Sequence, residues 1–174
     1  MTRISQICGI AAFACFSTAA SADVVIRFQE SAPRDRFIIE NVGACARGPM
    51  EIIIDMSGTA GGLYFDTTGA GAGVEVFQPF RKAEGSLELL SGDVLDGDTE
   101  LRLRVVDLPA SERAAFTIDV DDRLANSDMR QTMISGAEIA GGEIYAARLG
   151  GATVSAKFDE SSTAVLKLGD CPSS

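Results

Sequence analysis

Apolar and polar residues alternate with a period of two over most of this chain, and that period constrains its fold more than any other feature. The clearest run is Leu101-Arg102-Leu103-Arg104-Val105, in which the apolar side chains would face a core and the arginines would face solvent. Further alternating or β-branched runs cover 24–29, 37–39, 51–56, 63–65, 74–77, 87–90, 116–120, 143–149, 153–158 and 164–168. Because glycine, asparagine, aspartate and serine separate these runs, the sequence predicts about ten short antiparallel strands.

These strands predict an all-β protein. No segment carries an apolar stripe with the 3.6-residue period of a helix over three turns, and 110–115 is expected to form at most one helical turn, capped by Ser111. Strands that bury one alternating face pack as two sheets, so we expect an antiparallel, immunoglobulin-like β-sandwich. A closed barrel is the alternative. The glycine-rich stretch 57–73 lacks the Gly-Lys-Ser/Thr sequence of a P-loop and precedes a strand, so we expect it to connect strands.

The first 22 residues have the organisation of a secretory signal peptide. Arg3 precedes an apolar run from Ile7 to Phe16, and small residues follow up to Ala22. A basic residue, a short apolar region and an A-x-A sequence are typical of a cleaved signal, so we expect the mature chain to begin at Asp23. The apolar run is shorter than the roughly 20 residues of a membrane span, and no later stretch is long enough. The prediction is one domain, residues 23–174, located in the periplasm or outside the cell.

Cleavage would leave two of the four cysteines, Cys45 and Cys171. They are not spaced as a C-x-x-C redox motif, and an oxidising compartment favours one disulfide between them. The sequence has no histidine, which excludes Ser-His-Asp and Cys-His mechanisms and histidine-ligated zinc or copper. It also has no tryptophan, which leaves few aromatic platforms for sugars or bases.

The chain is strongly acidic, with 15 basic and 25 acidic residues. Loss of Arg3 with the signal would leave 14 basic residues and a net charge of −11. Such a charge repels nucleic acids and anionic membrane surfaces, so neither is expected as a partner. It favours cations and solubility instead.

Two acidic segments, 93–98 and 119–122, are candidates for a metal site. Ca²⁺ takes six to eight oxygen ligands, which carboxylates at the loop ends of a sandwich can supply. Aspartates at positions i and i+2 of a strand, such as Asp119 and Asp121, point to the same face of the sheet. The candidate calcium ligands are Asp93, Asp96, Asp98, Asp119, Asp121 and Asp122. Solvated turns are the alternative, because an Asp-Gly pair such as Asp96-Gly97 is typical of a β-turn. A pair of carboxylates could also act as acid and base on a glycosidic bond.

Several segments together resemble a known family. They are 30–37 (ESAPRDRF), 61–68 (GGLYFDTT), 71–80 (GAGVEVFQPF), 96–98 (DGD), 116–122 (FTIDVDD) and 135–141 (SGAEIAG). On these segments the chain resembles the bacterial secreted "aggregation factor core" proteins, which are named after the core of a sponge cell-aggregation proteoglycan. The resemblance implies calcium-dependent adhesion and brings no catalytic residues with it.

The sequence therefore predicts a secreted, non-enzymatic binding or adhesion domain, with calcium as its expected metal. Its expected partner is a protein or polysaccharide outside the cell. A carboxylate-dependent hydrolase of extracellular polysaccharide is one alternative, which would need two carboxylates about 5–10 Å apart in a cleft. A structural subunit that assembles through exposed strands is another.

Overall fold

The fold is known from a computed structural model, in which residues 21–31, 34–69, 77–124, 133–148 and 151–171 are described. These residues form eleven β-strands and one helix of four residues. The strands are β1 (Ser21–Gln29), β2 (Asp35–Asn41), β3 (Met50–Asp55), β4 (Tyr64–Asp66), β5 (Arg81–Glu84), β6 (Ser86–Leu89), β7 (Glu100–Asp107), β8 (Arg113–Asp121), β9 (Glu143–Arg148), β10 (Thr153–Lys157) and β11 (Thr163–Asp170), and the helix is α1 (Gly136–Ile139). No described helix has the length and apolar character needed to cross a membrane.

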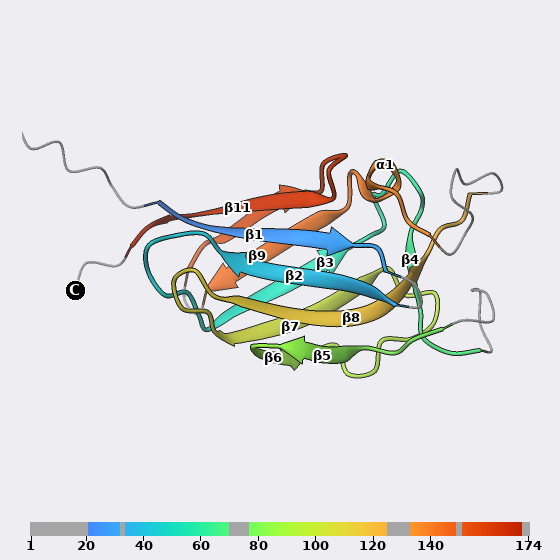
Figure 1. Cartoon of the computed structure of the whole chain (residues 1–174), viewed down its shortest axis with the longest axis horizontal. Coiled ribbons are helices and arrows are strands. Elements are labelled where there is room, and N and C mark those ends of the chain that lie inside the picture. The colour runs from blue at the N-terminus through green and yellow to red at the C-terminus, as the bar shows by residue number, and fades with distance from the viewer. Residues whose placement is uncertain (1–20, 32–33, 70–76, 125–132, 149–150, 172–174) are drawn as a thin grey trace, which may run out of the picture.

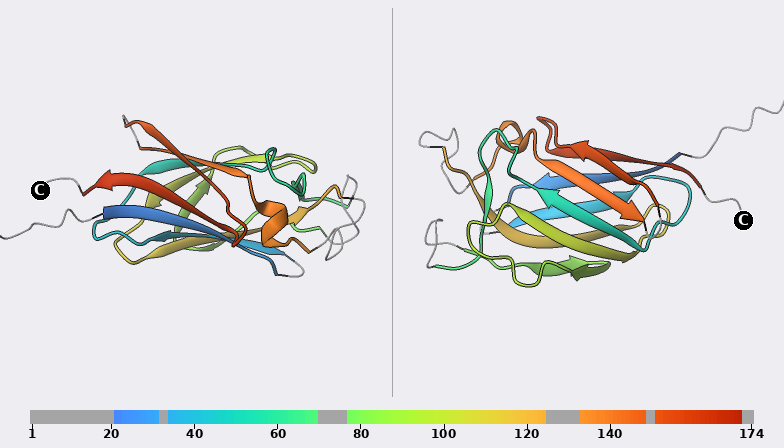
Figure 2. Two further views of the ribbon diagram at one scale, coloured as in Figure 1. Left: turned by 90° about the horizontal axis from the view of Figure 1, so that it is seen from above. Right: turned by 180° about the vertical axis from the view of Figure 1, so that it is seen from behind.

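The strands form two antiparallel sheets that pack face to face (Figure 1). One sheet has the order β11-β1-β2-β8-β4, with β5 also paired to β8, and the other has the order β10-β9-β3-β7-β6. Views from above and behind show the two layers with the loops gathered at both ends (Figure 2). The predicted antiparallel sandwich of about ten strands is confirmed. Its eleven described strands exceed the seven to nine of immunoglobulin domains.

The core follows directly from the period-two pattern. In β3 and β7 the inward residues Ile52, Ile54, Leu101 and Leu103 are fully buried, while Arg102 points outward. Aromatic rings fill the middle of the other sheet, where Phe37 stacks on Phe116 with ring centroids 5.0 Å apart. Because both sheets bury a continuous apolar face, the sandwich needs no helix to cover it.

Four local features differ from the sequence prediction or lie outside it. The expected helical turn at 110–115 is wrong: the Ser111 N–H donates to Asn41 O, and residues from Arg113 onward belong to β8. The helix that does form, α1, begins with a capping box between Ser135 and Glu138. Strand β5 was not predicted, because its sequence Arg-Lys-Ala-Glu has no apolar alternation. Most of the predicted strand 74–77 lies outside the described residues.

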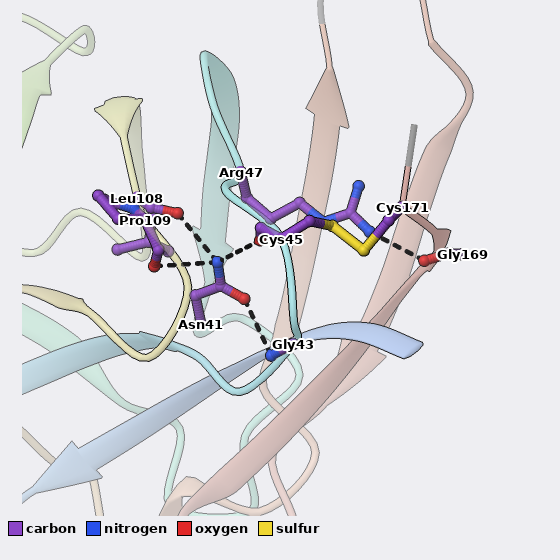
Figure 3. Close-up of a disulfide and its surroundings, with 8 residues drawn as sticks. All are labelled: Asn41, Gly43, Cys45, Arg47, Leu108, Pro109, Gly169 and Cys171. Carbon is purple, nitrogen blue, oxygen red and sulfur yellow. Dashed lines mark hydrogen bonds between the residues drawn. A yellow bond between two sulfur atoms is a disulfide. The ribbon is translucent and has the colours of Figure 1, made fainter. Parts of the chain in front are cut away.

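A disulfide closes one end of the sandwich, as predicted (Figure 3). Cys45 follows β2 and Cys171 follows β11, and their Cα atoms are 5.8 Å apart. Buried Asn41 donates through Nδ2 to the carbonyl oxygens of Cys45, Leu108 and Pro109, at 2.8, 2.9 and 3.1 Å. These bonds hold the chain around Cys45 in place independently of the covalent link.

Candidate functional site

Strand β4 brings the two acidic segments together at the end of the sandwich opposite the disulfide. On one edge it pairs with β8, so that Asp66 lies opposite Asp119 and Tyr64 lies opposite Asp121. Phe65 between them is fully buried in the core. Because side chains alternate along a strand, Asp66, Asp119 and Asp121 share the face of the sheet that points away from the core.

The other edge of β4 contacts the turn that precedes β7. The Phe65 N–H donates to Asp98 O at 2.8 Å, and the Gly97 N–H donates to Phe65 O at 2.9 Å. This turn runs from Leu95 to Asp98, where the Asp98 N–H donates to Leu95 O and Gly97 has a φ of 86° that favours glycine. The predicted turn at Asp96-Gly97 is therefore present, and it places Asp96 beside β4, where its Oδ1 accepts the Thr67 N–H at 3.2 Å.

Asp66 is the centre of the cluster. Its side chain is fully buried, and no N–H or O–H of the described residues donates to either carboxylate oxygen. The carboxyl group of Asp96 lies within hydrogen-bonding range of that of Asp66. Two carboxylates in such contact repel each other when both are ionised, so this arrangement calls for a proton or a cation between them.

The electrostatics of the neighbouring groups agree with this description. Burial raises the pKa of Asp66 to about 8, with further contributions from Asp96, Asp121 and Asp119. Burial and the charge of Asp121 raise the pKa of Asp119 to about 7. Burial, Asp121 and Asp66 raise the pKa of Tyr64 to about 12, and the guanidinium of Arg123, 5.0 Å from the centre of the Tyr64 ring, opposes that shift.

A further buried carboxylate lies beside the cluster, at the start of β2. Asp35, the first residue of β2, accepts hydrogen bonds from the backbone N–H groups of Ser31 at 3.2 Å and Val120 at 3.0 Å. Burial raises its pKa to about 8; these two bonds oppose the rise, and the charge of Asp119 adds to it. Asp35 lies next to Asp119, but its place opposite the core residue Ile118 puts it on the inner side of the sheet, away from the face that Asp66 and Asp119 share.

Three of the six predicted ligands raise the pKa of Asp66, namely Asp96, Asp119 and Asp121. The other three have different surroundings. Asp93 is exposed and lines a surface groove. The Asp98 carboxylate accepts the Leu95 N–H at 2.8 Å and closes the turn. Asp122 is buried, and its Oδ1 accepts the Leu124 N–H at 2.7 Å. Within the described ranges, no three metal-ligating side chains are grouped closely enough to form a ready metal centre.

Sequence reasoning missed Asp66 and Asp35. Asp66 follows the apolar run Leu-Tyr-Phe and Asp35 lies between two arginines, and neither has the local clustering that singled out the other acids. No local signal in the sequence singles out Asp66. Its pairing with β8 is a contact between segments distant in sequence.

Comparisons with known proteins add no relative to this description. No family model matches the chain, and neither a curated protein nor a solved structure does.

Proposed function

We propose that this protein is a secreted, non-enzymatic binding domain of the adhesion type, stabilised by Ca²⁺ at the β4 end of the sandwich. Its partner would be a protein or polysaccharide outside the cell, as the resemblance to the aggregation factor core proteins implies. The observation that carries the calcium part is Asp66, a fully buried carboxylate that meets a second carboxylate and receives no hydrogen-bond donor among the described residues.

Calcium fits this position because it accepts hard oxygen ligands in flexible numbers and geometries. Asp66 and Asp96 would supply the first carboxylates, and Asp119 and Asp121 lie on the same outward face of the sheet. Since no ready metal centre exists among the described residues, cation binding would draw these side chains toward the Asp66–Asp96 pair. The gain is relief of the repulsion between buried negative charges. The weak affinities of extracellular calcium modules suit such a site.

The secretion signal is consistent with the pairing of β1. The ladder between β1 and β11 shifts register between Ser21 and Asp23 and is regular from Asp23 to Arg27. Cleavage before Asp23 would leave this regular ladder intact, including the ion pair of 2.6 Å between Asp23 and Lys167. Cleavage there therefore costs the sandwich little.

A binding role accounts for the acidic end better than hydrolysis does. A glycosidase separates its two carboxyl groups by about 5–10 Å so that the substrate and water fit between them. The carboxyl group of Asp66 is instead buried and within hydrogen-bonding range of that of Asp96. That contact leaves no space for a sugar between them.

Thermal unfolding of the mature protein in calcium and in EDTA tests the proposal. At one hundred times Kd, Ca²⁺ adds about 2.7 kcal/mol to the free energy of unfolding. For a chain of this length that gain raises Tm by roughly 5–10 °C. Asp66→Asn keeps the shape of the side chain and should lose the calcium-dependent rise, whereas the exposed control Asp107→Asn should keep it. A wild-type Tm that is the same in 10 mM Ca²⁺ and in EDTA would refute the calcium site.

A further inference from the structure

A groove opens on the surface next to the acidic cluster. It has a volume of about 340 Å³ and is lined by Thr67, Thr68, Pro79, Phe80, Leu89, Asp93, Val94 and Leu95. Its walls come from both sheets, because Thr67 and Thr68 continue β4 and Pro79 and Phe80 precede β5, while the remaining residues lie at the end of β6 and in the loop after it. The groove is therefore the open lateral edge of the sandwich.

The groove lies where two sheet edges meet without a further strand. Within the described residues, β5 pairs only with β8 and β6 pairs only with β7. Both strands lie side by side along the lower edge of the sandwich (Figures 1 and 2). Neither sheet closes over the other here, so apolar groups that would be covered in the middle of the sandwich reach the surface.

The groove has an apolar floor. Phe80 and Leu89 are half-buried and pack against the core, and the Phe80 ring lies 5.1 Å from that of Phe116. Leu95 at the rim exposes 63% of its surface, the largest exposure among the large apolar side chains of the described residues. Floor and rim together form an apolar pocket for a partner, and packing against the core fixes the positions of the floor residues.

The polar groups of the groove select the charge of the partner. Asp93 is the one charged residue among those that line it, and Asp96 and Asp98 lie on the same loop. The whole chain carries a net charge of −10. A positively charged group is attracted to this groove, and a negatively charged one is repelled.

We propose that this groove is the docking site for a segment of a partner protein that inserts an apolar side chain flanked by lysine or arginine. The inference deepens the proposed function, because it gives the binding domain a surface and a partner chemistry. The inserted side chain would cover Phe80 and Leu89 and contact Leu95, and a flanking cation would face Asp93. The free edge of β5 or β6 would let an extended segment add backbone hydrogen bonds.

Fluorescence anisotropy with a labelled peptide of alternating lysine and phenylalanine tests the proposal. Leu95→Ser removes the apolar rim, and Asp93→Asn removes the charge without changing the side-chain shape. The matched controls are Val106→Ser and Asp107→Asn, on exposed residues at the far end of β7. We expect Leu95→Ser to weaken binding at least tenfold and Asp93→Asn to weaken it several-fold with a shallower salt dependence, while both controls bind as the wild type does. All four variants alter exposed residues, so their Tm should match that of the wild type.

Three results would overturn the proposal. Equal affinity for the wild type and all four variants would mean that the peptide is held only by the overall negative charge. Equal affinity for a peptide of lysine and serine would show that the apolar groove does not bind the phenylalanine side chains. Competition by a neutral oligosaccharide, with no loss in Leu95→Ser, would assign the groove to a sugar. Each measurement is made in Ca²⁺ and in EDTA, so that a missing calcium effect on Tm is separated from a missing peptide site.

Discussion

Removal of the disulfide is the perturbation whose effect the structure specifies most fully. The double variant Cys45→Ser with Cys171→Ser opens a link between residues 126 apart in the sequence. Asn41 still holds the backbone at Cys45, and Arg47 still donates through Nη2 to Gly169 O at 2.9 Å, next to the end of β11. The folded state therefore keeps its geometry, and the main effect falls on the unfolded chain.

The magnitude follows from the length of the loop that the link closes. In the chain-entropy model, a loop of this length contributes about 5 kcal/mol at 25 °C, near the top of the range measured for disulfides. Residual structure in the unfolded chain reduces that figure, so we expect a loss of about 3–5 kcal/mol. For a domain of this size, such a loss lowers Tm by roughly 10–20 °C.

Urea unfolding of the wild type and the double variant measures the loss directly. The wild type in excess dithiothreitol serves as the control, and it should match the double variant in midpoint and slope. Titration of the denatured mature wild type should detect no free thiol. A loss below about 1 kcal/mol, or two reactive thiols in the wild type, would refute the assignment of this disulfide as the main staple of the fold.

Three further outcomes follow from buried contacts. Asn41→Ala should cost about 3 kcal/mol in urea unfolding, because it leaves buried carbonyl groups and the Gly43 N–H without their partner; a loss below 1 kcal/mol would contradict this. Gly136→Ala should lower stability by about 1–3 kcal/mol, since its Cβ would lie 2.1 Å from the backbone oxygen of Glu160, whereas Ala137→Ser on the exposed side of α1 should be neutral. In EDTA, stability should fall as the pH rises from about 5 to about 8. The folded-state pKa values of Asp35 and Asp66, about 8, exceed the unfolded values near 4, so the folded state binds more protons between these values, and a flat pH profile would count against these shifts.

Most of the fold could be predicted because a strand with one buried face carries apolar residues at every second position of its sequence. Ile52, Ile54, Leu101 and Leu103 alternate with polar residues, and each alternate position is inside. The pattern fails where a strand has little burial, as in β5, whose first three residues are exposed. Sequence reasoning fails also at Ser111. A serine shortly before two alanines suggests the start of a helix there, but the Ser111 N–H donates to Asn41 O at the end of β2.

The site could be predicted only in part, for a different reason. Local density of acids identified Asp96, Asp119 and Asp121, and all three act on Asp66. Asp66 itself became recognisable only through the pairing of β4 with β8, across more than 50 residues of sequence. Register between distant strands depends on the packing of the whole sandwich, and no window of sequence around residue 66 contains that information.

The two ends of the sandwich differ in how they satisfy their polar groups. At the disulfide end, Asn41 and Arg47 bond to neutral carbonyl groups around a covalent link. At the β4 end, Asp66 is buried against another carboxyl group, and a pKa raised from 3.8 to about 8 corresponds to roughly 6 kcal/mol against its ionised form. The disulfide contributes a similar amount to stability. A fold that is held covalently at one end can therefore tolerate an unfavourable group of acids at the other, which is the arrangement expected when those acids are retained for binding.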